Sequence, residues 1–155
     1  MSQEVSVKLD KKLDGLFEKA GKEFKALRAE YLDETGDALL SAVRSNITAS
    51  GINDARGHVR AWQRKYTGTG GGYVAVRAVS GPGGKNSPGA ITGYLESGHP
   101  SRKPSGRAQR YVPRIKTGRA RAFGFYKSSE QDAERIAEDV AKKMEEALAG
   151  ALEGK

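Results

Sequence analysis

The chain has 155 residues, with 27 Lys or Arg against 19 Asp or Glu, so its formal net charge is 27 − 19 = +8. This length predicts one domain, residues 1–155, with a modest core. The lack of cysteine excludes disulfides and thiolate zinc sites, and no segment reaches the roughly 20 apolar residues of a membrane span. Because residues 1–12 also lack the apolar centre of a signal peptide, we expect synthesis in the cytoplasm and no membrane contact.

An amphipathic pattern predicts a long first helix over residues 10–48, in which Thr35-Gly36, near residue 36, is a break, a kink or a tolerated weak point. Apolar residues spaced by three or four positions form one stripe, whose candidate interface members are Leu13, Phe17, Phe24, Leu27 and Tyr31. The stripe packs either in the chain's own core or on a neighbouring subunit. The second alternative arises because so long a helix overhangs a domain of this size.

The periodicity then changes, and residues 58–79 are predicted to form an antiparallel β-hairpin. Residues 59–66 and 73–79 are rich in β-branched and aromatic side chains, and a Gly-rich loop separates them. Trp62 is expected to lie in the core or on a sheet face.

Residues 80–126 combine a Gly-rich loop, a short apolar motif and a basic run. The loop does not match a phosphate-binding loop, and Pro88-Gly89 is not expected to begin a helix. The motif, residues 91–98, is predicted as a short strand or a single helical turn. Tyr94 and Leu95 are expected to anchor it in the core, and Glu96 to pair with an arginine of the basic run.

The basic run extends from residue 102 to residue 121 and contains no acidic residue. Its eight cations are Arg102, Lys103, Arg107, Arg110, Arg114, Lys116, Arg119 and Arg121. They equal the net charge of the whole chain, so the positive field comes from one segment. The run is either a solvated loop or a surface for a partner, protein or nucleic acid.

The last helix is predicted over residues 128–152, and the spacing of its apolar residues predicts one buried face, formed by Ala133, Ile136, Ala137, Val140, Met144, Ala147, Leu148 and Leu152. Ser128 and Gln131 fit a capping box, and Phe123, Phe125 and Tyr126 are expected to return the chain to the core just before it. The expected class is therefore α+β, with the two amphipathic helices on a small, mainly antiparallel sheet and with long Gly-rich and basic loops.

Residues suited to catalysis are sparse. His58 and His99 are isolated and expected at the surface, and no close acid pair occurs outside the amphipathic helices. We therefore expect no enzyme, no catalytic or metal site, and no cofactor.

The order of elements resembles the neck or tail-completion proteins of long-tailed bacteriophages, also described as head-tail joining proteins and related to the minor tail protein Z group. The residues that carry the resemblance are Gly57 with Val59, the motif Tyr94-Leu95-Glu96-Ser97-Gly98, and the aromatic residues 123–126 before the last helix. The similarity spans nearly the whole chain, although its motifs are short.

This resemblance implies a non-enzymatic virion subunit of a ring, expected to be a hexamer. The ring would join the head connector to the tail, with head-closure and tail-terminator or tail-tube proteins as neighbours. DNA would pass through its lumen without sequence specificity. The competing interpretation is a basic nucleic-acid-binding module, in which Tyr111, Phe123, Phe125 and Tyr126 stack on bases between the arginines.

Overall fold

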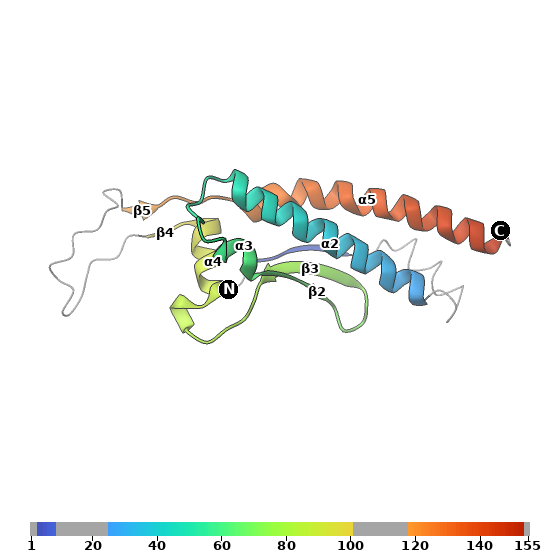
Figure 1. Cartoon of the computed structure of the whole chain (residues 1–155), viewed down its shortest axis with the longest axis horizontal. Coiled ribbons are helices and arrows are strands. Elements are labelled where there is room, and N and C mark those ends of the chain that lie inside the picture. The colour runs from blue at the N-terminus through green and yellow to red at the C-terminus, as the bar shows by residue number, and fades with distance from the viewer. Residues whose placement is uncertain (1–2, 9–24, 101–117, 154–155) are drawn as a thin grey trace.

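Two long helices lie side by side over a small sheet in the computed structural model, which describes residues 3–8, 25–100 and 118–153 (Figure 1). The helices are α2 (Lys25–Ala49) and α5 (Phe125–Leu152), and they run in opposite directions. The molecule is elongated along them. This arrangement confirms the α+β class, whereas residues 10–24 of the predicted first helix lie outside the described residues.

The sheet is antiparallel and has the strand order β1-β3-β2, with β1 (Val5–Lys8), β2 (Gln63–Thr67) and β3 (Tyr73–Ala78). Val76 pairs with Val5 on one side and with Lys65 on the other. Since side chains alternate along a strand, Val74 and Val76 share one face, and both are fully buried. Strand β1 was not predicted from the sequence, and it forms one edge of the sheet.

The core lies between this sheet face and the two helices. Leu39, Val43 and Ile47 of α2 are fully buried there. Val140, Met144 and Leu148 of α5 are also buried, so the predicted apolar face of the last helix is confirmed for these residues. At the helix interface, Asn46 Nδ2 donates hydrogen bonds to Ser129 Oγ at 2.9 Å and to Asp132 Oδ2 at 3.0 Å.

Gly36 does not break or kink the first helix. Helix α2 continues through it, and a Cβ placed there would lie 2.8 Å from Val74 Cγ2 and 3.0 Å from Lys65 Cδ. The glycine therefore allows the helix to approach the sheet closely, which explains its presence without a break.

The antiparallel pairing of β2 with β3 confirms the predicted hairpin, but the first five residues of the predicted range 58–79 form a helix. Residues His58–Trp62 form α3, and β2 begins only at Gln63. Both carboxylate oxygens of Asp54 accept backbone N–H groups at its start, from Val59 at 3.1 Å and Arg60 at 3.2 Å. This cap, supplied from outside the predicted strand, favours a helical turn. Trp62 is half-buried against the core, as expected.

The apolar motif lies in a helix of three turns, α4 (Pro88–Ser97), which follows the short 3₁₀ turn η2 (Gly84–Asn86). The expectation that Pro88 could not begin a helix was wrong, because proline suits the first helical position. Ser87 Oγ caps the helix by accepting the N–H of Ala90 at 3.3 Å. Leu95 packs against the core, whereas Tyr94 is exposed and is no anchor.

Helix α5 begins at Phe125, three residues before the predicted start. The hydroxyls of Ser128 and Ser129 donate to the carbonyls of Gly124 and Phe125, four residues earlier, so the predicted capping box does not form. The two-residue strands β4 (His99–Pro100) and β5 (Arg119–Ala120) pair at the end of the molecule near α4 (Figure 1). Within the described ranges, no helix is long and apolar enough to cross a membrane.

Candidate functional site

A buried carboxylate joins the apolar motif to the start of the last helix. Glu96 is 8% exposed, and its two oxygens accept the backbone N–H groups of Tyr126 at 2.9 Å and Lys127 at 3.1 Å. These are the second and third residues of α5, whose first-turn N–H groups have no partner within the helix. The carboxylate thus caps α5 and offsets its positive dipole end. The predicted pairing of Glu96 with an arginine of the basic run stays a prediction, because six of the eight cations of that run lie outside the described residues.

Backbone contacts strengthen the same junction. The N–H of Phe123 donates to the Leu95 carbonyl at 2.9 Å, and that of Gly124 to the Glu96 carbonyl at 3.1 Å. Gly98 has a φ of 69°, and a Cβ there would lie 2.5 Å from the carbonyl oxygen of Ala120. Only glycine fits this position. We call this unit, residues 95–98 with 120–127, the Glu96 joint.

Tyr126 connects the Glu96 joint to the sheet. Its hydroxyl donates to Gln63 Oε1, and Gln63 Nε2 donates to the Val59 carbonyl at 3.0 Å. Burial raises the pKa of Tyr126 far above its ordinary value. Phe125 and Tyr126 are both buried, so the expected aromatic return to the core is confirmed.

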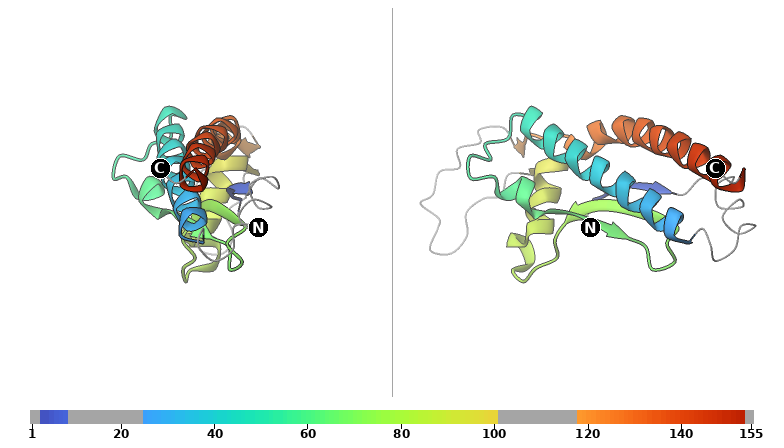
Figure 2. Two further views of the ribbon diagram at one scale, coloured as in Figure 1. Left: turned by 90° about the vertical axis from the view of Figure 1, so that its right-hand side faces the viewer. Right: turned by 45° about the vertical axis from the view of Figure 1, so that its right-hand side comes forward.

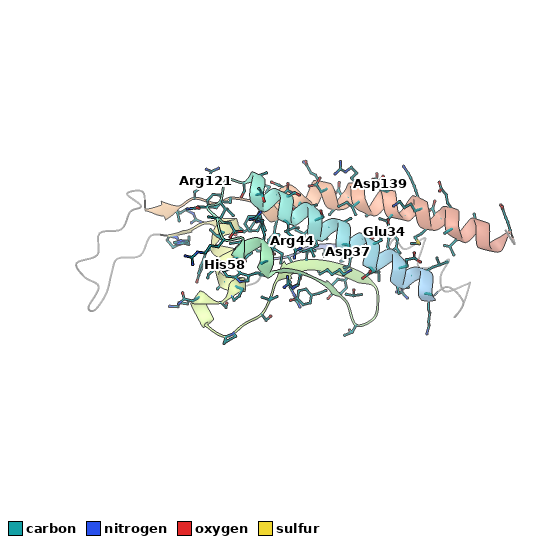
Figure 3. All side chains as sticks on the ribbon, in the orientation of Figure 1. Glu34, Asp37, Arg44, His58, Arg121 and Asp139 are labelled. Carbon is teal, nitrogen blue, oxygen red and sulfur yellow. The ribbon has the colours of Figure 1, made fainter. Side chains whose placement is uncertain are left out.

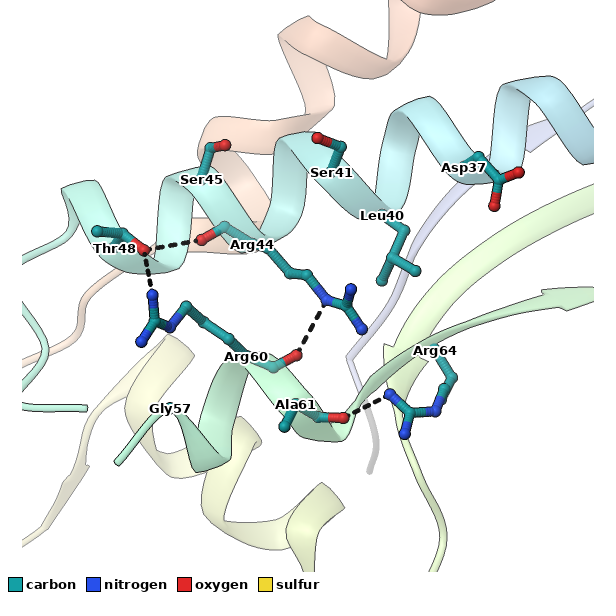
Figure 4. A pocket seen from close by; sticks show the side chains of 10 residues that line it. All are labelled: Asp37, Leu40, Ser41, Arg44, Ser45, Thr48, Gly57, Arg60, Ala61 and Arg64. Atoms are coloured by element: carbon teal, nitrogen blue, oxygen red, sulfur yellow. Dashed lines mark hydrogen bonds between the residues drawn. The ribbon is translucent and has the colours of Figure 1, made fainter. Parts of the chain in front are cut away.

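A groove of about 760 Å³ lies between α2 and α3 (Figure 4). Its lining residues are Asp37, Leu40, Ser41, Arg44, Ser45, Thr48, Gly57, Arg60, Ala61 and Arg64. Three arginines from three elements meet there, so we call it the arginine groove. Figure 3 places Arg44 and Asp37 along α2 on the side of the molecule that carries His58 of α3.

Carbonyl oxygens around the end of α3 hold Arg44 and Arg64, whereas Arg60 forms an ion pair with Asp54 at 3.4 Å. Arg44 Nε donates to the Arg60 carbonyl and Arg44 Nη2 to the Gln63 carbonyl, both at 3.2 Å, and Arg64 donates to the Ala61 carbonyl. Cations suit this helix end, where carbonyls lack partners. Each guanidinium has five donors, and Arg64 is exposed while Arg44 and Arg60 are half-buried, so the arginines can also bind a carboxylate or phosphate.

A second groove, of about 470 Å³, lies between the edge strand β1 and α5. Glu4, Glu130 and Glu134 line it, and Lys8 is the only cation among those of its lining residues that the structure describes. Ala133 and Ala137 line the side formed by α5, and their small side chains leave the space open. We call this the acidic groove.

Only two cations of the predicted basic run are described. Arg119 Nη2 donates to the Ser97 carbonyl at 3.3 Å, and the Arg121 guanidinium lies 5.2 Å from the centre of the Phe123 ring. The other six residues lie outside the described residues: Arg102, Lys103, Arg107, Arg110, Arg114 and Lys116. Their partner surface stays a prediction.

The predicted helix stripe serves the chain's own core wherever it is described. Tyr31 is 1% exposed and is therefore not available to a neighbouring subunit, and Leu27 is half-buried against the core. Leu13, Phe17 and Phe24 lie outside the described residues. Gly57 has a φ of 69° and precedes α3, which explains why a glycine occurs in that turn.

The histidines lie apart. His58 is exposed and stacks on Trp62, with ring centres 6.2 Å apart, and the ring of His99 meets Tyr94 edge to face. Among the described residues, no three His, Cys, Asp or Glu side chains are grouped so that they could hold a metal ion.

Sequence reasoning missed both grooves. Arg60 and Arg64 were assigned to one strand, and nothing in the local pattern connects Arg44 or strand β1 to a second segment. Comparisons with protein families, curated proteins and solved structures find no match for this chain.

Proposed function

We propose that this chain is a structural protein of a long-tailed bacteriophage virion. In this role it is a ring-forming neck or tail-completion subunit that joins the head connector to the tail and surrounds the DNA channel. It would be made in the host cytoplasm and reside in the virion.

The Glu96 joint is the observation that carries the proposal. The resemblance rests on two separate segments, the Tyr-Leu-Glu-x-Gly motif and the aromatic residues before the last helix. Glu96 caps α5, Gly98 permits the close approach to Ala120, and Tyr126 extends the contact to Gln63. Both segments therefore serve one structural purpose, which supports reading them as a single family feature.

The positions of the polar groups also support a building block. The buried carboxylate of Glu96 is used in capping a helix, whereas exposed charged residues line the two grooves, Arg64 in one and Glu130 and Glu134 in the other. Pro100, just before the basic run, pairs with Arg119 of the run in β4 and β5, at one end of the elongated molecule. This location suits contact with a protein stacked above or below a ring.

The proposal is tested by measuring the mass of the purified full-length chain by light-scattering chromatography, with negative-stain images of any large species. We expect closed rings of about six subunits, the number that the resemblance implies, with a central opening wide enough for duplex DNA. A chain that forms only monomers or dimers, and that adds no density to purified tails, contradicts the proposal.

The nucleic-acid-binding module is the second candidate, and the arginine groove favours it because arginines bind phosphates. The stacking route expected from the sequence is not available at two positions, since Phe125 and Tyr126 are 0% and 3% exposed. Retardation of duplex or single-stranded DNA by the monomeric chain, falling steeply with salt, would favour this candidate.

A further inference from the structure

We propose that the arginine groove of one copy of this chain binds the acidic groove of a second copy, in a head-to-tail contact. The proposal deepens the proposed ring function and rests on it for the closure of the assembly. The contact itself follows from the position, charge and shape of the two grooves.

The two grooves lie on opposite sides of the molecule. The arginine groove is formed by α2, α3 and β2, and the acidic groove by β1 and α5. In the strand order β1-β3-β2, β1 and β2 are the two edges of the sheet. The end-on view agrees: α3, in green, and β1, in dark blue, lie on opposite sides of the helix pair (Figure 2, left).

The grooves also lie at the same level along the helices. Asn46 of α2 hydrogen-bonds Ser129 and Asp132 of α5, so this part of α2 lies beside the first turns of α5. Arg44 is within one turn of Asn46, and Glu130 and Glu134 are within about one turn of Asp132. Subunits placed side by side with their helices aligned therefore bring the arginine groove of one copy to the acidic groove of the next.

The lining charges are opposite and equal. The arginine groove has three arginines and Asp37, which gives 3 − 1 = +2. The acidic groove has three glutamates and Lys8, which gives 1 − 3 = −2. Some of these charges are already paired within the chain: Asp37 with Lys65 at 2.6 Å, Arg60 with Asp54 at 3.4 Å, and Glu4 with Arg77 at 3.8 Å. The contact therefore rests mainly on Arg44 and Arg64 on one side and on Glu130 and Glu134 on the other. Arginine and carboxylate match in geometry, because the planar guanidinium can donate two parallel hydrogen bonds to one carboxylate.

Two different surfaces on opposite sides determine the kind of assembly. A two-fold dimer uses one patch that matches itself, whereas a contact between unlike patches repeats from copy to copy and forms a ring where the rotation closes. The occupant of the arginine groove is therefore a second copy of this chain, and its chemistry is the paired glutamates of α5.

The contact is tested by reversing charge on each side separately. Arg64→Glu and Glu134→Arg change exposed residues, and each should weaken self-association of the full-length chain about 10- to 100-fold, because like charges then face each other. Lys142→Glu and Glu146→Arg reverse exposed charges on α5 outside the lining of either groove, with the same changes in net charge, and should leave association unchanged. Light scattering at several protein concentrations measures the association.

Restoring self-association with a second charge reversal tests the contact more stringently than losing it. The double variant Arg64→Glu with Glu134→Arg re-creates an opposite pair at every contact and should regain association. An equal mixture of the two single variants should assemble as well, since alternating copies then meet with opposite charges at both kinds of contact. Circular dichroism of each variant checks that the chain is folded.

Each result has a distinct meaning. The groove contact is overturned if neither single charge reversal changes self-association, or if the double variant does not restore it. The proposed ring function would still hold in that case if closed rings form through other surfaces. Charge-sensitive association without closed rings supports the contact and contradicts the ring function. A wild-type chain that stays monomeric in low salt overturns both. Loss of duplex DNA binding in Arg64→Glu, without any effect on self-association, assigns the groove to nucleic acid instead.

Discussion

The Glu96 joint and the arginine groove use charge in opposite ways. At the joint, one carboxylate is buried and accepts two backbone N–H groups of α5. In the arginine groove, Arg44 donates to carbonyls at the end of α3. Arg64 is exposed to solvent there, and Arg44 and Arg60 are half-buried. The two carboxylate oxygens of Glu96 accept hydrogen bonds within the chain, whereas the arginines of the groove retain N–H donors for a partner.

Buried polar residues such as Glu96 therefore contribute to the stability of the fold, whereas exposed polar residues such as Arg64 are available for binding. A buried charge that loses its partner leaves an uncompensated group in a low-dielectric region, which destabilises the fold strongly. An exposed arginine that is removed exchanges its hydrogen bonds for water at small cost. Substitutions at the joint should therefore affect folding, and those in the groove should affect association.

The largest expected effect is at Gly98. Gly98→Ala places a Cβ 2.5 Å from the Ala120 carbonyl oxygen in a backbone conformation that side chains rarely adopt. We expect the free energy of unfolding to fall by about 3 kcal/mol, measured by urea denaturation. Gly51→Ala is the matched control, because Gly51 also has a positive φ but has open space around it, and should lose only about 1 kcal/mol. Equal losses would contradict the steric account of Gly98.

Glu96→Gln should have the next largest effect. The amide retains one acceptor oxygen, so one backbone N–H of Tyr126 or Lys127 faces a donor instead of a carboxylate oxygen. We expect a loss of about 2 kcal/mol at neutral pH in the same measurement. Glu130→Gln removes an exposed carboxylate from α5, the helix that Glu96 caps, and should change stability by less than about 0.5 kcal/mol. A similar loss in both variants would contradict capping by Glu96.

Tyr126→Phe removes a buried hydroxyl and leaves Gln63 Oε1 without its donor. We expect a loss of about 1 kcal/mol at neutral pH. No loss, or a gain, would mean that this hydrogen bond contributes nothing to folding.

Tyr126→Phe should also change how the stability of the chain depends on pH. Burial raises the pKa of Tyr126 in the folded chain, so between the unfolded value near 10 and the folded value the native state binds more protons than the unfolded state. Stability from this group is complete below about pH 10 and is lost as the pH rises further. Denaturation curves between pH 9 and about pH 11 should fall more steeply for the wild type than for Tyr126→Phe. Parallel curves would contradict the buried state of the hydroxyl.

The smallest effect on folding is expected in the groove. Arg64→Gln removes an exposed guanidinium that bonds the Ala61 and Gln63 carbonyls. We expect a loss of less than about 1 kcal/mol, seen as a small shift in the thermal midpoint. A loss as large as that of Glu96→Gln would make the arginine groove a folding element and remove the contrast between the two regions.

The long helices were predictable because their apolar periodicity is local. The α5 positions Val140, Met144 and Leu148 were identified from spacing alone and are buried. Two helix starts were misplaced because their caps are distant or unusual: Glu96 caps α5 from about thirty residues away, and Pro88 begins α4 as a first-turn proline. The sequence left a break, a kink or a tolerated weak point open at Gly36, because its neighbour, Val74, comes from a strand that sequence reading could not place beside it.

Local patterns in the sequence specify the α+β class, the apolar faces of the helices and the existence of strand β3, because periodicity, propensity and burial act over a few neighbouring residues. The contacts of the charged side chains depend on the tertiary structure. Arg44 reaches the end of α3, Glu4 reaches the first turns of α5, and Glu96 reaches the backbone of Tyr126. These contacts join residues far apart in the chain, and no local pattern encodes them because their energies arise only when packing brings the segments together.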